Sequence, residues 1–234
     1  MKISIIIPCF NHQEYVATAI ASALDQTIPC EIIFVNDGST DNSLEIAKSF
    51  ENRIRIVNQV NKGLPSARNT GIMWATGDFV LFLDADDILQ ENCVEKIIEA
   101  IKNNPDADII SPSFKCFGLA QNEVILMGNP TIEDFKTGNR IGYCSCIRRS
   151  VLLEVGGYSS KMWCGYEDLH LWYDLLFRGK KLITIQEVLW LYRVKEKSMI
   201  HDAQSHHKEL MVQIAKDFPK IFPEVVEIKT LLPK

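Results

Sequence analysis

The first half of the chain alternates between short apolar runs and segments whose apolar residues recur at helical spacing. The runs, rich in β-branched residues, predict strands at residues 3–7, 32–35, 54–57, 79–83 and 107–110. The intervening segments predict helices at residues 15–24, 42–50, 65–74 and 93–101. Strands that alternate with helices favour an α/β fold, in which a Rossmann-like, mostly parallel sheet carries helices on both faces.

This rhythm changes after about residue 112, where the pattern becomes mixed α+β. We expect strands at residues 113–118, 123–127, 140–147, 181–185 and 188–192. Helices are expected at residues 165–177 and 203–218. Because no linker rich in Gly, Ser or Pro separates the two parts, we predict a single domain over residues 1–234. Its parts are two halves at about 1–112 and 113–200, and a helical tail at 201–234.

The predicted strand at residues 79–83 ends in three carboxylates, Asp84, Asp86 and Asp87. Acids at the end of a buried strand repel one another and lose hydration unless a positive group lies among them. A hard divalent cation with oxygen ligands is a suitable partner, and a cation that also binds phosphates would make this a nucleotide site. The alternative is that the acids form a solvated turn and cap the next helix.

In open α/β sheets, ligands bind at the carboxyl ends of strands, near the switch in strand order. The first two predicted strands end at this edge in the segments PCFN (residues 8–11) and NDG (residues 36–38). Gly38 allows a tight turn or a close approach of the backbone to a ligand. Asp37 could accept hydrogen bonds from a base or a ribose, or could form the turn, and the sequence does not decide between them.

Charged residues also open two of the predicted helices. Arg68 lies at a helix start that favours anions, so it could pair with a phosphate or stack on a base, or could pair with an acid of the sheet edge. Glu167 and Asp168 begin another helix, where the helix dipole alone would favour acids. Trp163, just before them, could form an apolar wall for a sugar ring or belong to the core.

Composition and charge exclude several other classes of protein. The chain of 234 residues has a net charge of −5, and no basic tract marks a nucleic-acid surface. No apolar run is long enough to span a membrane and the N-terminus does not resemble a signal peptide, so we expect a cytoplasmic location. The 7 cysteines lack zinc-site spacing and are expected to be free thiols.

A set of segments occurs along the chain in the order ISIIIPCFN, VNDGSTDNS, NKGLPSARNTGI, GDFVLFLDADD and GYEDLHLW. Together they closely resemble the family 2 glycosyltransferases of GT-A fold, from residue 3 to about residue 198. The resemblance implies an inverting, metal-dependent transferase of the hexosyl or N-acetylhexosaminyl class. It would use a nucleotide-diphosphate sugar, with a UDP-sugar preferred, in surface polysaccharide or glycoconjugate synthesis. Residues 1–112 would then form the nucleotide-sugar-binding half, and residues 113–200 the acceptor-side half.

The resemblance also implies roles for the residues at matching positions. The nucleotide-sugar would be bound by Pro8, Phe10, Asn11, Asp37, Gly38, Arg68 and Asp84. Asp37 would bind the base, usually uracil, and Asp84 would touch the ribose or the sugar. Asp86 would ligate Mn²⁺ or Mg²⁺, and Asp168 would be the general base. Phe10 departs from the pattern, since tyrosine is common there, and this puts a ring hydroxyl in doubt.

The implied chemistry agrees with these residue types. A metal on the phosphates stabilises the charge of the departing nucleoside diphosphate, and a base on the opposite face of the sugar gives inversion. A sugar-phosphate nucleotidyltransferase is an alternative, although no Gly-rich basic loop follows the first strand, and a non-catalytic nucleotide-sugar-binding protein is another. The acceptor could be a saccharide, a lipid-linked molecule or a protein, and peripheral membrane contact stays open. Lys195 and its basic neighbours form either a flap over the pyrophosphate or a solvated loop.

Overall fold

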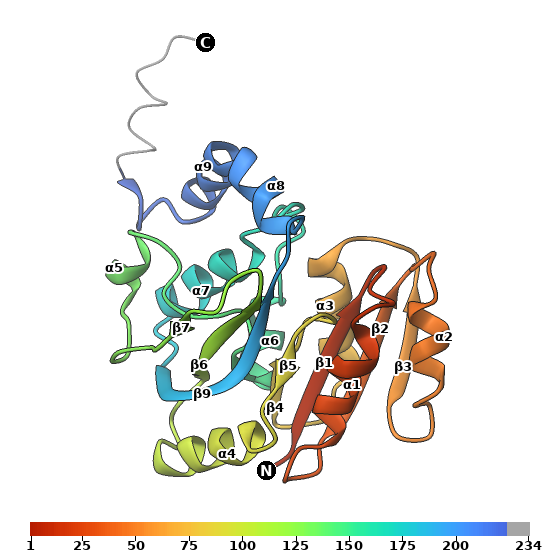
Figure 1. The fold of residues 1–234 in the computed structure, drawn as a ribbon. Helices are drawn as coiled ribbons and strands as arrows, with labels where there is room; N and C mark the ends of the chain where they lie inside the picture. Colours follow the sequence, from red (N-terminus) through yellow and green to blue (C-terminus); the bar gives the residue numbers. More distant parts are fainter. Residues whose placement is uncertain (224–234) are drawn as a thin grey trace.

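The computed structural model describes residues 1–223, and its first half follows the predicted alternation of strands and helices, except for the unpredicted two-residue strand β5, Ile88–Leu89 (Figure 1). The elements are β1 (Ile3–Cys9), α1 (Val16–Leu24), β2 (Glu31–Asp37), α2 (Ser43–Lys48), β3 (Arg55–Gln59), α3 (Leu64–Trp74), β4 (Phe79–Phe82), β5 (Ile88–Leu89) and α4 (Cys93–Asn103). β1 and β4 are buried along their whole lengths, which explains why their sequences are continuous apolar runs rather than alternating ones.

The parallel part of the sheet has the strand order β3-β2-β1-β4. The chain steps one way along the sheet from β1 to β3 and then returns to β4 on the other side of β1. Since such connections are right-handed, α1 and α2 lie on one face and α3 lies on the other. Accordingly α1 contacts α2, while α3 contacts α6 (Arg149–Val155). The reversal between β1 and β4 opens a crevice at their carboxyl ends.

The second half extends the same sheet and makes it mixed. Its elements are β6 (Ile109–Gly118), β7 (Glu123–Val124), α5 (Ile132–Phe135), β8 (Cys146–Arg148), α6 and α7 (Glu167–Phe177), followed by β9 (Leu182–Val194). The short strand β8 lies between β4 and β6 and is antiparallel to both. β8 is only the end of the strand predicted at 140–147, and β7 is only the start of the one predicted at 123–127.

Two pairs of predicted strands are single long strands. Residues 109–118 form β6 and residues 182–194 form β9, and the two pair in parallel along their lengths. Their register is irregular around Pro112 and Ser113. A proline lacks the N–H that continues a ladder and therefore suggests a strand end in the sequence, but an irregularity of this kind accommodates it within a strand.

The helix predicted at residues 203–218 is two helices, α8 (Met199–Ser205) and α9 (His207–Asp217), joined at His206. Figure 1 shows both at the end of the molecule where β9 finishes. The part of the predicted tail beyond residue 223 lies outside the described residues. Within residues 1–223, no helix combines the length and the apolar character that a membrane crossing requires.

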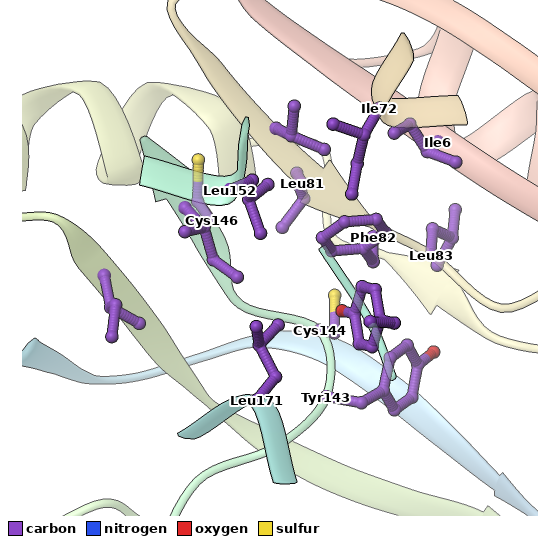
Figure 2. Packing of buried hydrophobic residues seen from close by; sticks show 14 of the residues in the cluster. Ile6, Ile72, Leu81, Phe82, Leu83, Tyr143, Cys144, Cys146, Leu152 and Leu171 are labelled. Carbon is purple, nitrogen blue, oxygen red and sulfur yellow. The ribbon is translucent and has the colours of Figure 1, made fainter. Parts of the chain in front are cut away.

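The core lies on both sides of β4. Figure 2 shows Phe82 between Ile6 and Ile72 on one side and Tyr143 on the other. Phe82 also meets Tyr158 edge to face, with the ring centroids 5.2 Å apart. All seven cysteines are free, as expected from their spacing, and six of them are buried. This packing fixes the end of β4, which carries the acidic cluster.

Candidate active site

A cavity of about 950 Å³ opens at the carboxyl ends of β1, β2 and β4 and reaches under α8 and α9. Of the residues predicted to form the site, it is lined by Pro8, Phe10, Asp37, Arg68, Asp84, Asp86 and Asp168. The structure therefore brings together side chains that lie as much as 160 residues apart in the sequence. Asn11 and Gly38 do not line the cavity.

Asn11 and Gly38 instead shape the loops beside it. Asn11 adopts a left-handed backbone with φ of 58°, and its side-chain oxygen accepts a hydrogen bond from Thr40 N at 2.8 Å. Gly38 also has a positive φ, and a Cβ built on it would lie 2.8 Å from Asn61 N. The glycine is therefore required for a close approach of two protein loops.

Asp37 is 2% exposed and uses both carboxylate oxygens within the protein. One oxygen accepts hydrogen bonds from Gln59 Nε2 at 2.7 Å and Lys62 N at 2.9 Å, and the other accepts one from Gly63 N at 2.9 Å. The carboxylate thus ties the end of β2 to the loop that begins α3. This arrangement fixes the side wall of the cavity and leaves about one of the four lone-pair sites of Asp37 for a ligand.

Arg68 joins two carboxylates from distant parts of the chain. Its guanidinium donates from Nη2 to Asp84 Oδ1 at 2.8 Å and from Nη1 to Glu167 Oε1 at 2.7 Å. The position depends on Gly71, which lies one turn along α3 on the same face, because a Cβ there would lie 2.3 Å from Ile6 Cγ2. Burial raises the pKa of Asp84 and of Glu167, and Arg68 opposes that rise in both.

The pairing of Arg68 with Asp84 is the structural alternative that the sequence left open. The guanidinium is 1% exposed and lies 5.2 Å from the ring centroid of Tyr143 and 5.1 Å from that of Tyr158. Its Nε has no hydrogen-bond partner among the described residues. Arg68 thus links β4 to α7 while still lining the cavity.

Asp86 faces two basic side chains. Its Oδ2 lies 2.5 Å from Lys195 Nζ and 3.7 Å from His12 Nε2. Burial alone would raise the pKa of Asp86, but His12 and Lys195 outweigh it and lower the pKa to about 2. Asp86 is therefore ionised at neutral pH. Lys195, which the sequence placed in a flap or a solvated loop, here neutralises Asp86 directly.

Asp87 has a different role from the other two acids of the cluster. Its Oδ2 accepts a hydrogen bond from Tyr143 Oη, and its Oδ1 accepts one from Arg193 N at 2.7 Å. Burial, and then the charges of Asp86 and Asp84, raise its pKa well above the usual range. Asp87 therefore joins the end of β4 to β9, and because its side chain is buried it does not belong to the solvated turn that was the alternative for this cluster.

The carboxylates of the cavity can hold a divalent cation only if a bound substrate supplies most of the coordinating atoms. No group of three or more His, Cys, Asp or Glu side chains gathers at metal-binding distance within the part of the chain that is described. Mg²⁺ is commonly bound through one or two carboxylates and the phosphates of a substrate, and it keeps several waters. Asp86 meets this requirement, provided that Lys195 moves away from it.

Asp168 lies at the start of α7 on the cavity wall. Its Oδ2 accepts a hydrogen bond from Asn139 Nδ2 at 2.7 Å, and its Oδ1 accepts one from Leu169 N at 2.7 Å. Burial raises the pKa of Asp168, while Arg68, then these two hydrogen bonds, oppose the rise. The preceding Tyr166 has φ of 61°, a conformation uncommon for a non-glycine residue, which turns the chain into α7.

Two further residues of the cavity were not singled out from the sequence, His12 and Asn139. His12 follows the PCFN segment directly, so its position after the first strand was a usable signal. Asn139 comes from the segment between β7 and β8, whose pattern is least regular. His207 Nδ1 lies 2.9 Å from Tyr166 Oη, a contact between α9 and the start of α7 that no local pattern encodes.

A cavity with clustered charged side chains at the switch point of a parallel sheet is typical of ligand-binding α/β proteins, nucleotide-binding enzymes among them. The profile described as Glycosyl transferase family 2 matches residues 4–156. The chain therefore belongs to glycosyl transferase family 2, and it has the glycosyltransferase activity and nucleotide-sugar donor of that family.

Individual relatives agree with this membership. An uncharacterized glycosyltransferase of Nostoc sp. is 33% identical, over 88% of this chain and 67% of its own length. S. aureus TarS (residues 1–349) with UDP-GlcNAc has a similar fold, with a TM-score of 0.78 at 20% identity over 94% of this chain and 67% of that one. A mannosyltransferase of Pyrobaculum calidifontis with GDP-Man and Mn²⁺ has a TM-score of 0.71 at 17% identity, over 97% and 68%. The chain thus spans about two thirds of each of these proteins. The two structural neighbours show that its fold is GT-A-like.

Proposed function

We propose that this protein is a metal-dependent, inverting glycosyltransferase that moves a hexosyl or N-acetylhexosaminyl group from a UDP-sugar to an acceptor hydroxyl. One observation carries the proposal. Arg68 bridges Asp84 at the end of β4 and Glu167 at the start of α7, so that the carboxyl groups of Asp86 and Asp168 line the same cavity. A donor diphosphate near Asp86 would then leave its sugar between the two acids.

In this proposal each of the two acids has a separate task. Mn²⁺ or Mg²⁺, held by Asp86 and the diphosphate, would supply Lewis-acid stabilisation of the negative charge on the departing phosphate. Asp168 takes the proton from the acceptor hydroxyl as that oxygen attacks the anomeric carbon. Because the base and the leaving group lie on opposite faces of the sugar, the configuration inverts. Asn139 holds Oδ2 of Asp168 and thereby orients the carboxylate.

The remaining donor contacts follow the cavity wall. Asp37 offers its remaining lone pair to the N–H of a uracil, and Phe10, which is exposed and lines the same cavity, offers an apolar face to the base or ribose. Asp84 Oδ1 is held by Arg68 at 2.8 Å, which leaves Asp84 Oδ2 for a hydroxyl of the ribose or sugar. TarS is described with UDP-GlcNAc and the mannosyltransferase with GDP-Man and Mn²⁺, which supports a nucleotide-sugar and a metal here. We place the reaction in surface polysaccharide or glycoconjugate synthesis.

The metal requirement gives the test of this function. Calorimetric titration of UDP is expected to show tight binding with Mn²⁺ and a loss of affinity of at least about tenfold in EDTA, since the diphosphate then loses its bridge to Asp86. Asp86→Ala is expected to bind UDP equally weakly with and without Mn²⁺. Equal affinity in the parent protein with and without metal would contradict metal dependence, and stronger binding of GDP than of UDP would contradict the donor.

A second prediction concerns Lys195, which occupies the position beside Asp86 that a metal must share. A metal has to displace the Lys195 ammonium, so Lys195→Met is expected to raise the affinity for Mn²⁺ alone by about tenfold. The free Mn²⁺ signal in electron paramagnetic resonance measures this directly. Lys197→Met is the matched control, because Lys197 also lines the cavity but has no ion pair with Asp86. Unchanged or weaker Mn²⁺ binding by Lys195→Met would show that the two cations do not compete.

A further inference from the structure

A second groove, of about 700 Å³, runs along α9 beside the catalytic cavity. Trp163 lines both of them, and it is the sole residue that they share within residues 1–223. Its side chain is 59% exposed, although it lies only five positions before the proposed base in the sequence. The groove and the cavity therefore meet at Trp163, which forms part of the wall of each.

The indole of Trp163 packs against a neighbouring ring. The ring of His206 meets it edge to face, with centroids 5.3 Å apart and planes inclined by 70°. An indole face carries negative electrostatic potential, and the C–H bonds on one face of a pyranose ring are weakly positive and apolar. An exposed, oriented indole next to a sugar-transfer cavity therefore matches the face of a saccharide ring.

The charge of the groove further restricts the chemical class of its ligand. Lys161, Lys208 and Lys216 line it against a single acid, Glu209, whereas the whole chain has a net charge of −5. Lys161 is paired with Asp217 at 2.6 Å, while Lys208 and Lys216 have no ion-pair partner in the described part of the chain. The two lysines lie eight residues apart on α9, a separation of about 12 Å along the helix axis.

We propose that this groove binds the acceptor, and that the acceptor is an anionic saccharide chain. One ring of the chain stacks on Trp163, and the carboxylates or phosphates of the following rings pair with Lys208 and Lys216. The hydroxyl to be glycosylated then enters the cavity toward Asp168. This inference rests on the proposed glycosyl transfer, because it supplies the acceptor side of the same reaction.

Hexagalacturonate is a suitable probe, with maltohexaose as an uncharged saccharide of equal length. We expect the parent protein to bind hexagalacturonate more tightly than maltohexaose in calorimetry, by a margin that shrinks as salt is added. The double variant Lys208→Gln/Lys216→Gln is expected to weaken hexagalacturonate binding about fivefold, and Trp163→Ala is expected to weaken it by a similar factor. The double variant Arg53→Gln/Lys102→Gln removes the same charge from exposed sites elsewhere and should leave the affinity unchanged.

Three results would overturn the inference: no binding of hexagalacturonate, equal binding by parent and groove variants, or binding of the parent only to anionic phospholipid vesicles, which would make the surface a membrane contact. Titration of UDP with Mn²⁺ separates this inference from the proposed function. If Lys208→Gln/Lys216→Gln keeps the affinity for UDP but loses hexagalacturonate, that result supports the groove. If the parent protein binds no UDP, the proposed function is contradicted. The hexagalacturonate titrations then still decide whether the groove binds an anionic saccharide.

Discussion

Asp168→Asn is expected to abolish nearly all sugar transfer while leaving donor binding intact. The amide keeps the size of the side chain but cannot accept the proton of the acceptor hydroxyl, and loss of a general base lowers the rate by about 10²–10⁴. The donor is held from the side of Asp86, so the affinity for UDP with Mn²⁺ should stay within about threefold. The measurement is the transfer rate with an identified donor and acceptor, or hydrolysis of the donor as a substitute, alongside calorimetry.

The neighbouring Glu167 provides the control for this variant. Glu167 Oε1 is occupied by Arg68 at 2.7 Å, and its side chain is buried, whereas Asp168 is less buried and lines the cavity with Asn139 as a partner. Glu167→Gln should therefore lower the rate less than Asp168→Asn. A transfer rate for Asp168→Asn near that of the parent would show that another residue is the base, even though the family would stand.

The assignment of Asp168 as the base also gives the direction in which the transfer rate changes with pH. A base must be ionised to accept a proton, and burial raises the pKa of Asp168. The rate should therefore fall as the pH falls through that raised pKa, and the acid limb of the profile should lie above the range of an ordinary aspartate. Asp168→Asn should lose this limb, which a purely structural role of the residue would not explain.

Much of the fold could be predicted because it is encoded locally. The parallel half depends on apolar runs and helical periodicity within short windows, and these patterns predicted its strands and helices. The second half depends on pairings between distant segments. The three-residue strand β8 inserts between β4 and β6, and no local pattern states that Leu81 will lie opposite Cys146. The long pairing of β6 with β9 likewise continues past Pro112, which locally suggests an end.

Only those residues of the site that lie in local sequence motifs could be predicted. The acids at strand ends and helix starts were visible because each follows an apolar run, but their partners come from far along the chain. Arg68 and Glu167 are 99 residues apart, and Lys195 and His12 are 183 residues apart. Asp37 illustrates the limit, because its bonds to Lys62 N and Gly63 N show a structural task that sequence reasoning could not separate from ligand binding.

Arg68→Met is expected to destabilise the fold strongly. The variant leaves Asp84 and Glu167 near one another without their shared cation, and removing one partner of a buried ion pair costs about 3–5 kcal/mol. Denaturant unfolding followed by circular dichroism measures the loss. Arg53→Met removes the same charge from an exposed side chain and should change the free energy of unfolding by less than about 0.5 kcal/mol.

The loss of stability in Arg68→Met should also depend on pH, and proton linkage gives the direction of this dependence. Burial already raises the pKa of both Asp84 and Glu167, and without Arg68 the rise is no longer opposed. The folded variant then holds more protons than the unfolded chain above the unfolded pKa of these acids, so its stability falls as the pH rises. The difference between parent and variant should be larger at about pH 8 than at about pH 5. Adding Glu167→Gln to Arg68→Met removes one unpaired acid and should restore part of the stability. If the double variant is as unstable as the single variant at both pH values, then packing rather than charge makes Arg68 necessary.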